Sequence, residues 1–387
     1  MAIEAPTWRD GKRYAWLLGL LVPSLPLMAW ALVEATGLGV FWFIGPAVVF
    51  GLFPLLDMLV GTDQDNPPDS VIAWLEQDRY YRWCTYLFIP VQYGGLVLAC
   101  YLWSNGGLST IESIGLALTM GVVGGIAINT AHELGHKRDD MEKWLSRVAL
   151  AQTGYGHFFI EHNRGHHVRV ATPEDPASSR LGESFWAFLP RTVAGSLSSA
   201  WGIEAKRLDR LGKSHWSIHN DILSAWLMTV GLFAVLAIAF GPVVLPYLLV
   251  QAVLGFSLLE VVNYLEHYGL LRQKKEDGRY QRCMPEHSWN SNNVASNVLL
   301  YHLQRHSDHH ANPTRRYQAL RHVDEAPQLP TGYAGMIVLA WIPPLWRRVM
   351  DPILVDHYEG DLTLANIQPS KREKILARYG GSGGAAS

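Results

Sequence analysis

The sequence predicts an all-α integral membrane protein with six transmembrane helices, and three observations support that prediction. Six long stretches carry almost no charge, charged residues make up only 17% of the 387 residues, and the 32 lysines and arginines are unevenly distributed. A helix that crosses a bilayer needs roughly 20 apolar residues. The chain also contains 15 tryptophans and 16 tyrosines, residues that gather where helices enter and leave a membrane.

The expected spans fall into two groups, four before residue 131 and two after residue 220. The first span contains Pro23 and Pro26, which predict a kink because proline removes a backbone donor from the helix. A soluble helical bundle would carry charges on the outer face of each helix, and these stretches have almost none on any face. The six expected spans are residues 14–36, 40–60, 84–103, 110–130, 221–240 and 243–269.

The distribution of basic residues predicts the orientation. The short connections at 36–39, 104–109 and 241–242 contain no lysine or arginine, whereas the other polar segments contain all of them. Because positively charged loops remain on the cytoplasmic side, we expect both termini and both large polar regions in the cytoplasm. A seventh apolar stretch, residues 332–346, is short and contains two adjacent prolines. We expect it to be an interfacial or re-entrant element and not a span.

These patterns divide the chain into five expected parts. The last of them, GGSGGAAS, has the composition of a flexible linker or tag remnant. The parts are a four-span region at 1–130, a cytoplasmic segment at 131–220, spans five and six at 221–270, a cytoplasmic C-terminal region at 271–379, and the linker at 380–387.

Charge and cysteine usage exclude some classes of partner and site. The net charge of −2, without a basic stripe, gives no reason to expect a nucleic-acid partner. Cys84, Cys100 and Cys283 form no CxxC pair, so we expect neither a disulfide framework nor a thiolate metal site.

Histidines carry the strongest functional signal. Nine of the 16 histidines fall in four short segments at the cytoplasmic ends of expected spans or in the polar regions. Spacings of three and four residues place side chains on one face of a helix, within reach of a shared metal ion. Imidazole is a good ligand for iron, zinc, copper or nickel, and nine imidazoles exceed what one ion accepts, which favours a site for two metal ions. The segments are HELGH (132–136), EHNRGHH (161–167), NYLEHYG (263–269) and LQRHSDHH (303–310).

Two other functions fit part of this pattern. HELGH alone matches the zinc-protease signature, with Glu133 as general base, but such a site needs only one further protein ligand. A histidine-rich metal transporter is the second alternative, although transporters place their sites near the middle of the bilayer.

Carboxylates, amides and other histidines near the four segments are candidates to orient the metal ligands by hydrogen bonding. For each one, a role as a helix cap, a solvated charge or a packing residue is an equal alternative. His215, His219, His287, His322 and His357 have no ligand-like neighbours in sequence and are expected to be surface or packing residues. The candidate orienting residues are Glu133, Glu161, Asn163, Asn263, Glu266, Asp308, His157 and His302.

At this point the sequence resembles a known family. HELGH, EHNRGHH and HSDHH match the three histidine boxes of the membrane desaturase–hydroxylase superfamily. HELGHK, EHNRGHH, NYLEHYG and LQRHSDHH are similar to the forms found in the bacterial membrane alkane hydroxylases, the alkane 1-monooxygenases. The resemblance covers nearly the whole chain and includes NPPDSV (66–71), ATPEDPASSR (171–180) and HSWNSN (287–292).

The resemblance implies oxygen-dependent hydroxylation of the terminal methyl group of medium- to long-chain n-alkanes in the bacterial inner membrane. It also implies two non-haem iron ions and electrons from rubredoxin, which a flavin-containing rubredoxin reductase reduces. The nearest alternative in the same superfamily is a fatty-acyl desaturase or ω-hydroxylase. The ligands that the resemblance implies are His132, His136, His162, His166, His167, His267, His306, His309 and His310.

An n-alkane offers no polar group, so a protein recognises it only by shape and by apolar burial, worth about 0.8 kcal/mol per CH₂. We expect Val49, Phe50 and Phe53 on the second span to help set the depth of a substrate channel, with packing or contact with lipid as the alternative. Because no CxxC pair is present, rubredoxin must dock from outside. Basic residues that could steer it, or bind lipid headgroups instead, are Arg272, Lys274, Lys275, Arg279, Arg315 and Arg316.

Overall fold

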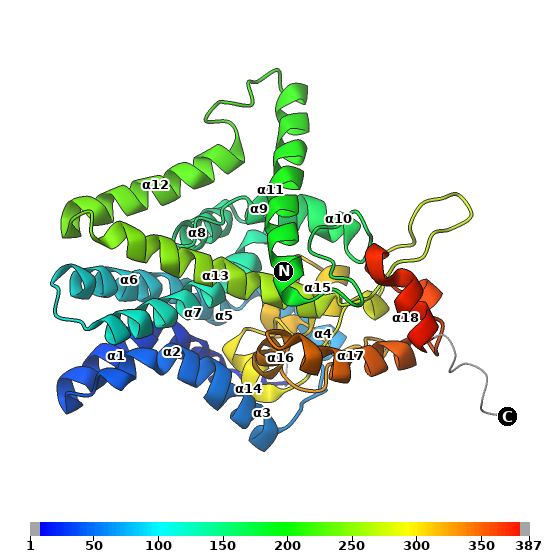
Figure 1. Ribbon diagram of the computed structural model, residues 1–387, viewed down its shortest axis with the longest axis horizontal. Coiled ribbons are helices and arrows are strands. Elements are labelled where there is room, and N and C mark those ends of the chain that lie inside the picture. Colours follow the sequence, from blue (N-terminus) through cyan, green and yellow to red (C-terminus); the bar gives the residue numbers. More distant parts are fainter. Residues whose placement is uncertain (1–7, 380–387) are drawn as a thin grey trace.

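The computed structural model describes residues 8–379, so the expected linker at 380–387 lies outside the described residues. Within that range all regular secondary structure is helical, apart from four isolated β-bridges. The all-α prediction is therefore confirmed. In Figure 1 most of the long helices lie side by side in the left part of the molecule, and α17 and α18 lie toward the right.

Six helical segments are long and apolar enough to cross a membrane, as the sequence predicts, which makes this a multi-pass membrane protein. The first, Ala15–Thr36, joins a 3₁₀ turn η1 (Ala15–Leu20) to α1 (Leu21–Thr36). The third begins at Arg79, earlier than expected, and joins α5 (Arg79–Tyr86) to α6 (Phe88–Ser104). The others are Gly39–Val60, Thr110–Gly135 (α7), Asp221–Phe240 (α12) and Val244–Glu266 (α13).

The second span is irregular, and its prolines explain why. It consists of η2 (Gly39–Phe43), α2 (Ile44–Ala47), a π-helical turn η3 (Val48–Leu52) and α3 (Phe53–Val60). Pro54 has no backbone N–H and its ring clashes with the carbonyl of the residue four positions earlier, which disturbs regular α-helical bonding in the preceding turn. The widened turn presents Val49 toward the protein interior, where it is buried.

Helix α7 is longer than expected. Ser109 and Glu112 form a capping box at its start, which satisfies backbone donors that have no partner inside the helix. The helix then continues to Gly135 instead of ending near residue 130. His132 is therefore part of the span helix itself, and His136 is the residue that ends it.

The apolar stretch at 332–346 does not form a span. It contains the short helix α16 (Tyr333–Ala340), and α17 (Pro343–His357) starts at the two prolines. Tyr333, Ala334 and Ile337 of α16 are buried. This element packs inside the bundle, against η3, α3 and α13.

The remaining helices form the polar regions. In Figure 1 helix α11 stands nearly upright above the span helices, and the connection to α12 forms a loop at its upper end. Their bounds are α4 (Asp69–Gln77), α8 (Asp140–Ala151), α9 (Phe158–Glu161), η4 (His162–His166), α10 (His167–Arg169), α11 (Phe185–Arg210), η5 (Pro285–His287), α14 (Val294–Leu299), α15 (His306–Ala311), η6 (Tyr317–Ala319), η7 (Leu362–Leu364), η8 (Pro369–Lys371) and α18 (Arg372–Tyr379).

Contacts between distant segments place the start of the chain, the connection after the second span and the C-terminal region together. The Lys12 ammonium lies 2.5 Å from the Asp63 carboxylate, and Arg13 pairs with Asp78. The Asp63 amide donates to the Asn292 carbonyl at 2.9 Å. An even number of spans returns the chain to one side of the membrane, and these contacts agree with that topology.

Candidate metal centre

The structure brings all nine histidines of the four segments together in two adjoining clusters. In each cluster, one ring nitrogen from every member lies within 4.8 Å of those of the other members. The clusters adjoin each other, because the ring centroids of His167 and His310 are 4.5 Å apart. The first cluster is His132, His136, His162, His167 and His309, and the second is His166, His267, His306 and His310.

Local helix geometry decides which histidine joins which cluster. In α15, His306 and His310 are four residues apart and share a cluster, while His309 faces the other one. In η4 the backbone is π-helical, so positions five apart are aligned, and His162 joins His167. His166, four residues after His162, belongs to the second cluster. An α-helical spacing argument would have paired His162 with His166.

The ring nitrogens approach one another more closely than neutral imidazoles can explain. His309 Nε2 lies 2.9 Å from His132 Nε2 and 3.1 Å from His167 Nε2. In the second cluster, His306 Nε2 lies 2.9 Å from His310 Nε2 and 3.3 Å from His267 Nε2. A neutral ring nitrogen offers either one proton or one lone pair, so these double contacts cannot all be hydrogen bonds.

A metal ion at the centre of each cluster would explain the spacing. Two nitrogens that lie about 2.1 Å from one ion at a right angle are about 3.0 Å apart, close to the contacts observed. Burial, helped by neighbouring imidazoles, lowers the pKa of His309 and His310 well below the ordinary value, so both rings are neutral at pH 7 with lone pairs available. The two clusters are suited to hold metal through imidazole ligands.

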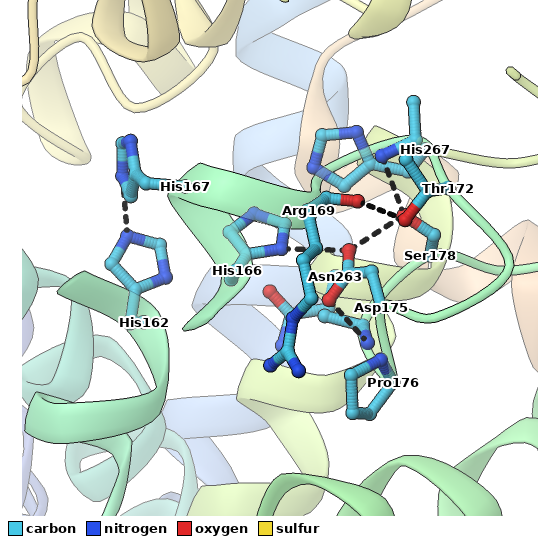
Figure 2. Close-up of polar contacts among 12 residues, drawn as sticks. His162, His166, His167, Arg169, Thr172, Asp175, Pro176, Ser178, Asn263 and His267 are labelled. Atoms are coloured by element: carbon cyan, nitrogen blue, oxygen red, sulfur yellow. Dashed lines mark hydrogen bonds and ion pairs between the residues drawn. The ribbon is translucent and has the colours of Figure 1, made fainter. Parts of the chain in front are cut away.

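Several groups fix the rings from behind, through the nitrogen that faces away from the cluster. His166 Nδ1 is 2.9 Å from the buried Asp175 carboxylate, which also accepts from Ser178 Oγ at 2.6 Å (Figure 2). His267 Nδ1 donates to the main-chain carbonyl of His287 at 3.1 Å. Such bonds set the tautomer and hold Nε2 toward the metal position.

Two of these partners were not among the residues singled out from the sequence. Asp175 follows His166 by nine residues, beyond helical spacing, and the connection after α10 folds back to bring it into contact. His287 was expected at the surface or in general packing, and it is buried with its carbonyl on a cluster histidine. The one sequence signal for Asp175 was its position in ATPEDPASSR (171–180), a segment that resembles the family.

The predicted orienting residues have varied positions. Glu266 Oε1 lies 3.3 Å from His306 Nδ1, although the pair is too poorly aligned for a hydrogen bond. Glu133 pairs with Lys137 at 3.0 Å and accepts from the Tyr317 amide at 3.3 Å. The recorded partners of the others are Arg169 for Glu161, Phe159 for Asn163, Glu260 for Asn263, the Tyr317 carbonyl for His302, and Arg315 for Asp308, whereas His157 is buried with both ring nitrogens unpartnered.

An apolar cavity of about 650 Å³, part of it open to solvent and here called the inner cavity, adjoins the two clusters. His132 and His162 of the first cluster and His306 of the second form part of its wall. Apolar side chains from α7, α13, the turn after α14 and α16 line most of the rest, including Ile126, Leu258, Leu259, Val262, Leu300 and Ile337.

Two of the three expected channel residues line the inner cavity. Val49 and Phe53 are in its wall, one turn apart on the second span. Phe50 lies elsewhere, because the π-helical turn directs it to a neighbouring apolar cavity, where it packs against Trp341 with ring centroids 4.8 Å apart.

Comparison with known proteins agrees with the architecture. Residues 110–340 match the family model described as "Fatty acid desaturase". The chain is 49% identical to an alkane 1-monooxygenase of Ectopseudomonas oleovorans, over 98% of this chain and 94% of the relative. It is 51% identical to one of Acinetobacter baylyi (96% and 92%) and 47% identical to one of Alcanivorax borkumensis (97% and 93%). The chain therefore belongs to the fatty acid desaturase family and, within it, to the alkane 1-monooxygenases.

Proposed function

We propose that this protein hydroxylates the terminal methyl group of medium- to long-chain n-alkanes to primary alcohols, using O₂ and two non-haem iron ions. The observation that carries the proposal is that histidines of both clusters, His132, His162 and His306, line an apolar cavity. The names of the relatives, alkane 1-monooxygenases at 46–51% identity, support the same reaction.

The five histidines of the first cluster would hold one ion and the four of the second cluster the other. Bound iron would supply the activation of O₂ and the oxidation of a C–H bond, chemistry that redox-inert zinc lacks. The chain's own residues hold the ligands in place. Asp175 and the His287 carbonyl each fix one ring of the second cluster, and Phe158 stacks on His162 of the first, with centroids 4.8 Å apart.

The inner cavity would bind the alkane by apolar burial and direct one chain end toward the clusters. Each buried CH₂ contributes about 0.8 kcal/mol, and no polar group of the substrate needs a partner. Holding the terminal carbon beside the reacting centre makes the reaction effectively unimolecular and selects the end position. The wall also contains three polar side chains. Asn129 comes from α7, which carries His132. Asn263 and Glu266 come from α13, which ends just before His267.

Electrons would come from rubredoxin, reduced in turn by rubredoxin reductase. The three cysteines are free, and Cys84 and Cys100 lie in span helices, so no electron-transfer centre built on cysteine pairs is formed by the described chain. Electrons must therefore reach the clusters from a centre outside the described residues. The distribution of basic residues supports an inner-membrane location with both termini and the clusters on the cytoplasmic side.

Other functions receive less support. A zinc protease would need the Glu133 carboxylate free to activate water, and in this structure it is bound by Lys137 and the Tyr317 amide and is absent from the cavity wall. A fatty-acyl desaturase or ω-hydroxylase must also accommodate a charged or thioester head group. The inner cavity, walled mainly by apolar side chains, favours a substrate without one.

Product analysis tests the proposal. Purified protein in lipid nanodiscs, loaded with iron and supplied with reduced rubredoxin and O₂, should convert dodecane to 1-dodecanol, measured by gas chromatography with mass spectrometry. Oxygen uptake should depend on the alkane. Desaturated fatty-acyl products without any alcohol from alkane would contradict the proposal and favour the desaturase alternative.

A further inference from the structure

An open depression lies beside the first histidine cluster, on the outside of the molecule. We call it the basic basin. It spans about 770 Å³, much of it open to solvent, where the end of α7, the start of α8 and η4 meet. Its wall contains five cationic side chains and no carboxylate. The residues used below are His136, Lys137, Arg138, Lys143, Arg147 and Arg164.

His136 connects the basic basin directly to the cluster. It is a member of the first cluster and also part of the basin wall, and it is only half-buried. Its Nε2 is buried and has no hydrogen-bond partner, as expected for an atom directed toward a metal position. A molecule seated in the basin would therefore be separated from the cluster by a single imidazole ring.

Ion pairs beneath the basin do not neutralise it. Glu204 pairs with both Arg207 and Arg164, and Asp221 pairs with both Arg147 and Arg207, so three arginines share two carboxylates. Lys137 is neutralised by Glu133, in a buried pair.

Acidic residues at the rim of the basin do not neutralise its positive charge either. Lys143 pairs with Asp140, which is 97% exposed, and such pairs are strongly screened by water. Asp139 is occupied in capping α8 through the Met141 amide. Arg138 is exposed, and residues 8–379 provide no recorded ion pair for it. The nine imidazoles add no negative charge, so any bound metal ions would increase the positive potential.

The basic residues singled out from the sequence are less suited to dock a partner. Arg315 and Arg316 pair with the buried carboxylates of Asp308 and Glu142, and Arg272 is buried against main-chain carbonyls. Arg279 pairs with Asp277. Lys274 and Lys275 remain exposed, on a loop whose residues line neither the basic basin nor the inner cavity.

We propose that the basic basin is the docking surface for the acidic one-electron carrier, with His136 as the point at which electrons enter the cluster. The inference rests on the proposed function and deepens it. Hydroxylation consumes one alkane, one O₂, two electrons and two protons and yields one alcohol and one water, so a one-electron carrier must dock twice in each cycle. The alkane uses the inner cavity, whose wall includes His132 and His162 but not His136, so the two routes do not compete.

Charge reversal tests the docking surface. The double variant Arg138→Glu/Arg164→Glu and the matched control Lys274→Glu/Lys275→Glu change the net charge equally. Both are compared with wild-type holoenzyme in phosphatidylcholine nanodiscs, with an acidic bacterial rubredoxin as the probe. In the basin variant we expect the Kd for rubredoxin to rise, and the rate of reduction by rubredoxin to fall, on the order of tenfold or more. Both quantities should change little in the control. In the wild type, added salt should weaken binding.

Three outcomes would overturn the proposal. Wild-type affinity and salt dependence in the basin variant would show that rubredoxin docks elsewhere, while leaving the proposed function intact if dodecanol still forms. An equal defect in both double variants would show a general effect of charge. Lost binding of phosphatidylglycerol to the basin variant in detergent, measured by native mass spectrometry, with rubredoxin binding intact, would assign the basin to lipid headgroups. Failure of wild-type holoenzyme to form dodecanol with rubredoxin or with dithionite would instead remove the proposed function and this inference with it.

Discussion

At the scale of single residues, the cluster histidines should be individually essential for metal binding. His309 is a suitable test, since its Nε2 contacts rings from α7 and from α10. We expect His309→Ala to lose bound metal and hydroxylation together. His215→Ala is a matched control, because His215 lies outside the clusters. It is on the loop after α11 and contacts the exposed Asp209 near the end of that helix. Metal analysis of both purified variants checks this, and full metal content in His309→Ala would contradict the ligand assignment.

Asp175 offers a second test at this scale. Its carboxylate holds His166 Nδ1 from a fully buried position, so Asp175→Asn should let the ring reorient and lower metal affinity about 10- to 100-fold. Asp209→Asn is the control, since Asp209 contacts His215 at 2.7 Å but is 67% exposed. Competition with a chelator measures both affinities. Equal affinities for Asp175→Asn and the wild type would show that Asp175 does not orient His166.

The sequence was informative about ligands and much less so about their partners. Histidines stand out because nine of them fall in four short segments, and all nine converge in space. Asp175 could not be identified by helical spacing, because a turn and not a helix returns it to His166. Glu133 illustrates the opposite case: it is adjacent to His132 in sequence, but its position on α7 directs it to Lys137.

At the scale of elements, the second span should control which alkanes fit. Val49→Trp would fill part of the inner cavity, and Phe53→Ala would enlarge it. We expect the first to favour octane over dodecane by about tenfold or more and the second to shift preference to longer chains, since each excluded CH₂ forfeits about 0.8 kcal/mol. Phe50→Ala, which alters the neighbouring cavity, is the control. Unchanged alkane-length profiles for both cavity variants would show that Val49 and Phe53 do not control which alkanes fit.

The positions of the helices follow from the sequence, but their local irregularities do not. Apolar length predicts all six spans, and the boundaries differ by a few residues because α5 and the end of α7 include polar residues. The π-helical turn η4 has no comparable signal in a single sequence, although it decides that His162 joins His167. Proline explains η3 once the structure is known, since Pro54 blocks regular α-helical bonding.

At the scale of the whole molecule, metal should stabilise the fold by joining distant segments. The clusters combine residues from α7, η4, α10, the end of α13 and α15. Because an ion that binds only the folded state adds to its stability, chelation should lower Tm by several degrees or more, and re-addition of Fe²⁺ should restore it. Scanning fluorimetry in detergent checks this. A Tm unaffected by chelation, with metal loss verified, would mean that the clusters form no metal cross-link.

The overall architecture was predictable because the bilayer imposes strong constraints on the length and composition of the helices that cross it. The tertiary arrangement of the polar regions was not. Arg315 and Arg316 are candidates, from the sequence, for steering rubredoxin or binding lipid headgroups, yet both pair with buried carboxylates. Pairing partners that lie far apart in the chain, such as Arg316 and Glu142, leave no local trace in the sequence.

Anomalous X-ray scattering from crystals of the iron-loaded protein, recorded on both sides of the iron K edge, tests the central claim most directly. The account predicts two iron peaks, one among His132, His136, His162, His167 and His309 and the other among His166, His267, His306 and His310. A single peak, a signal at the zinc edge instead, or iron located outside these nine rings would contradict it.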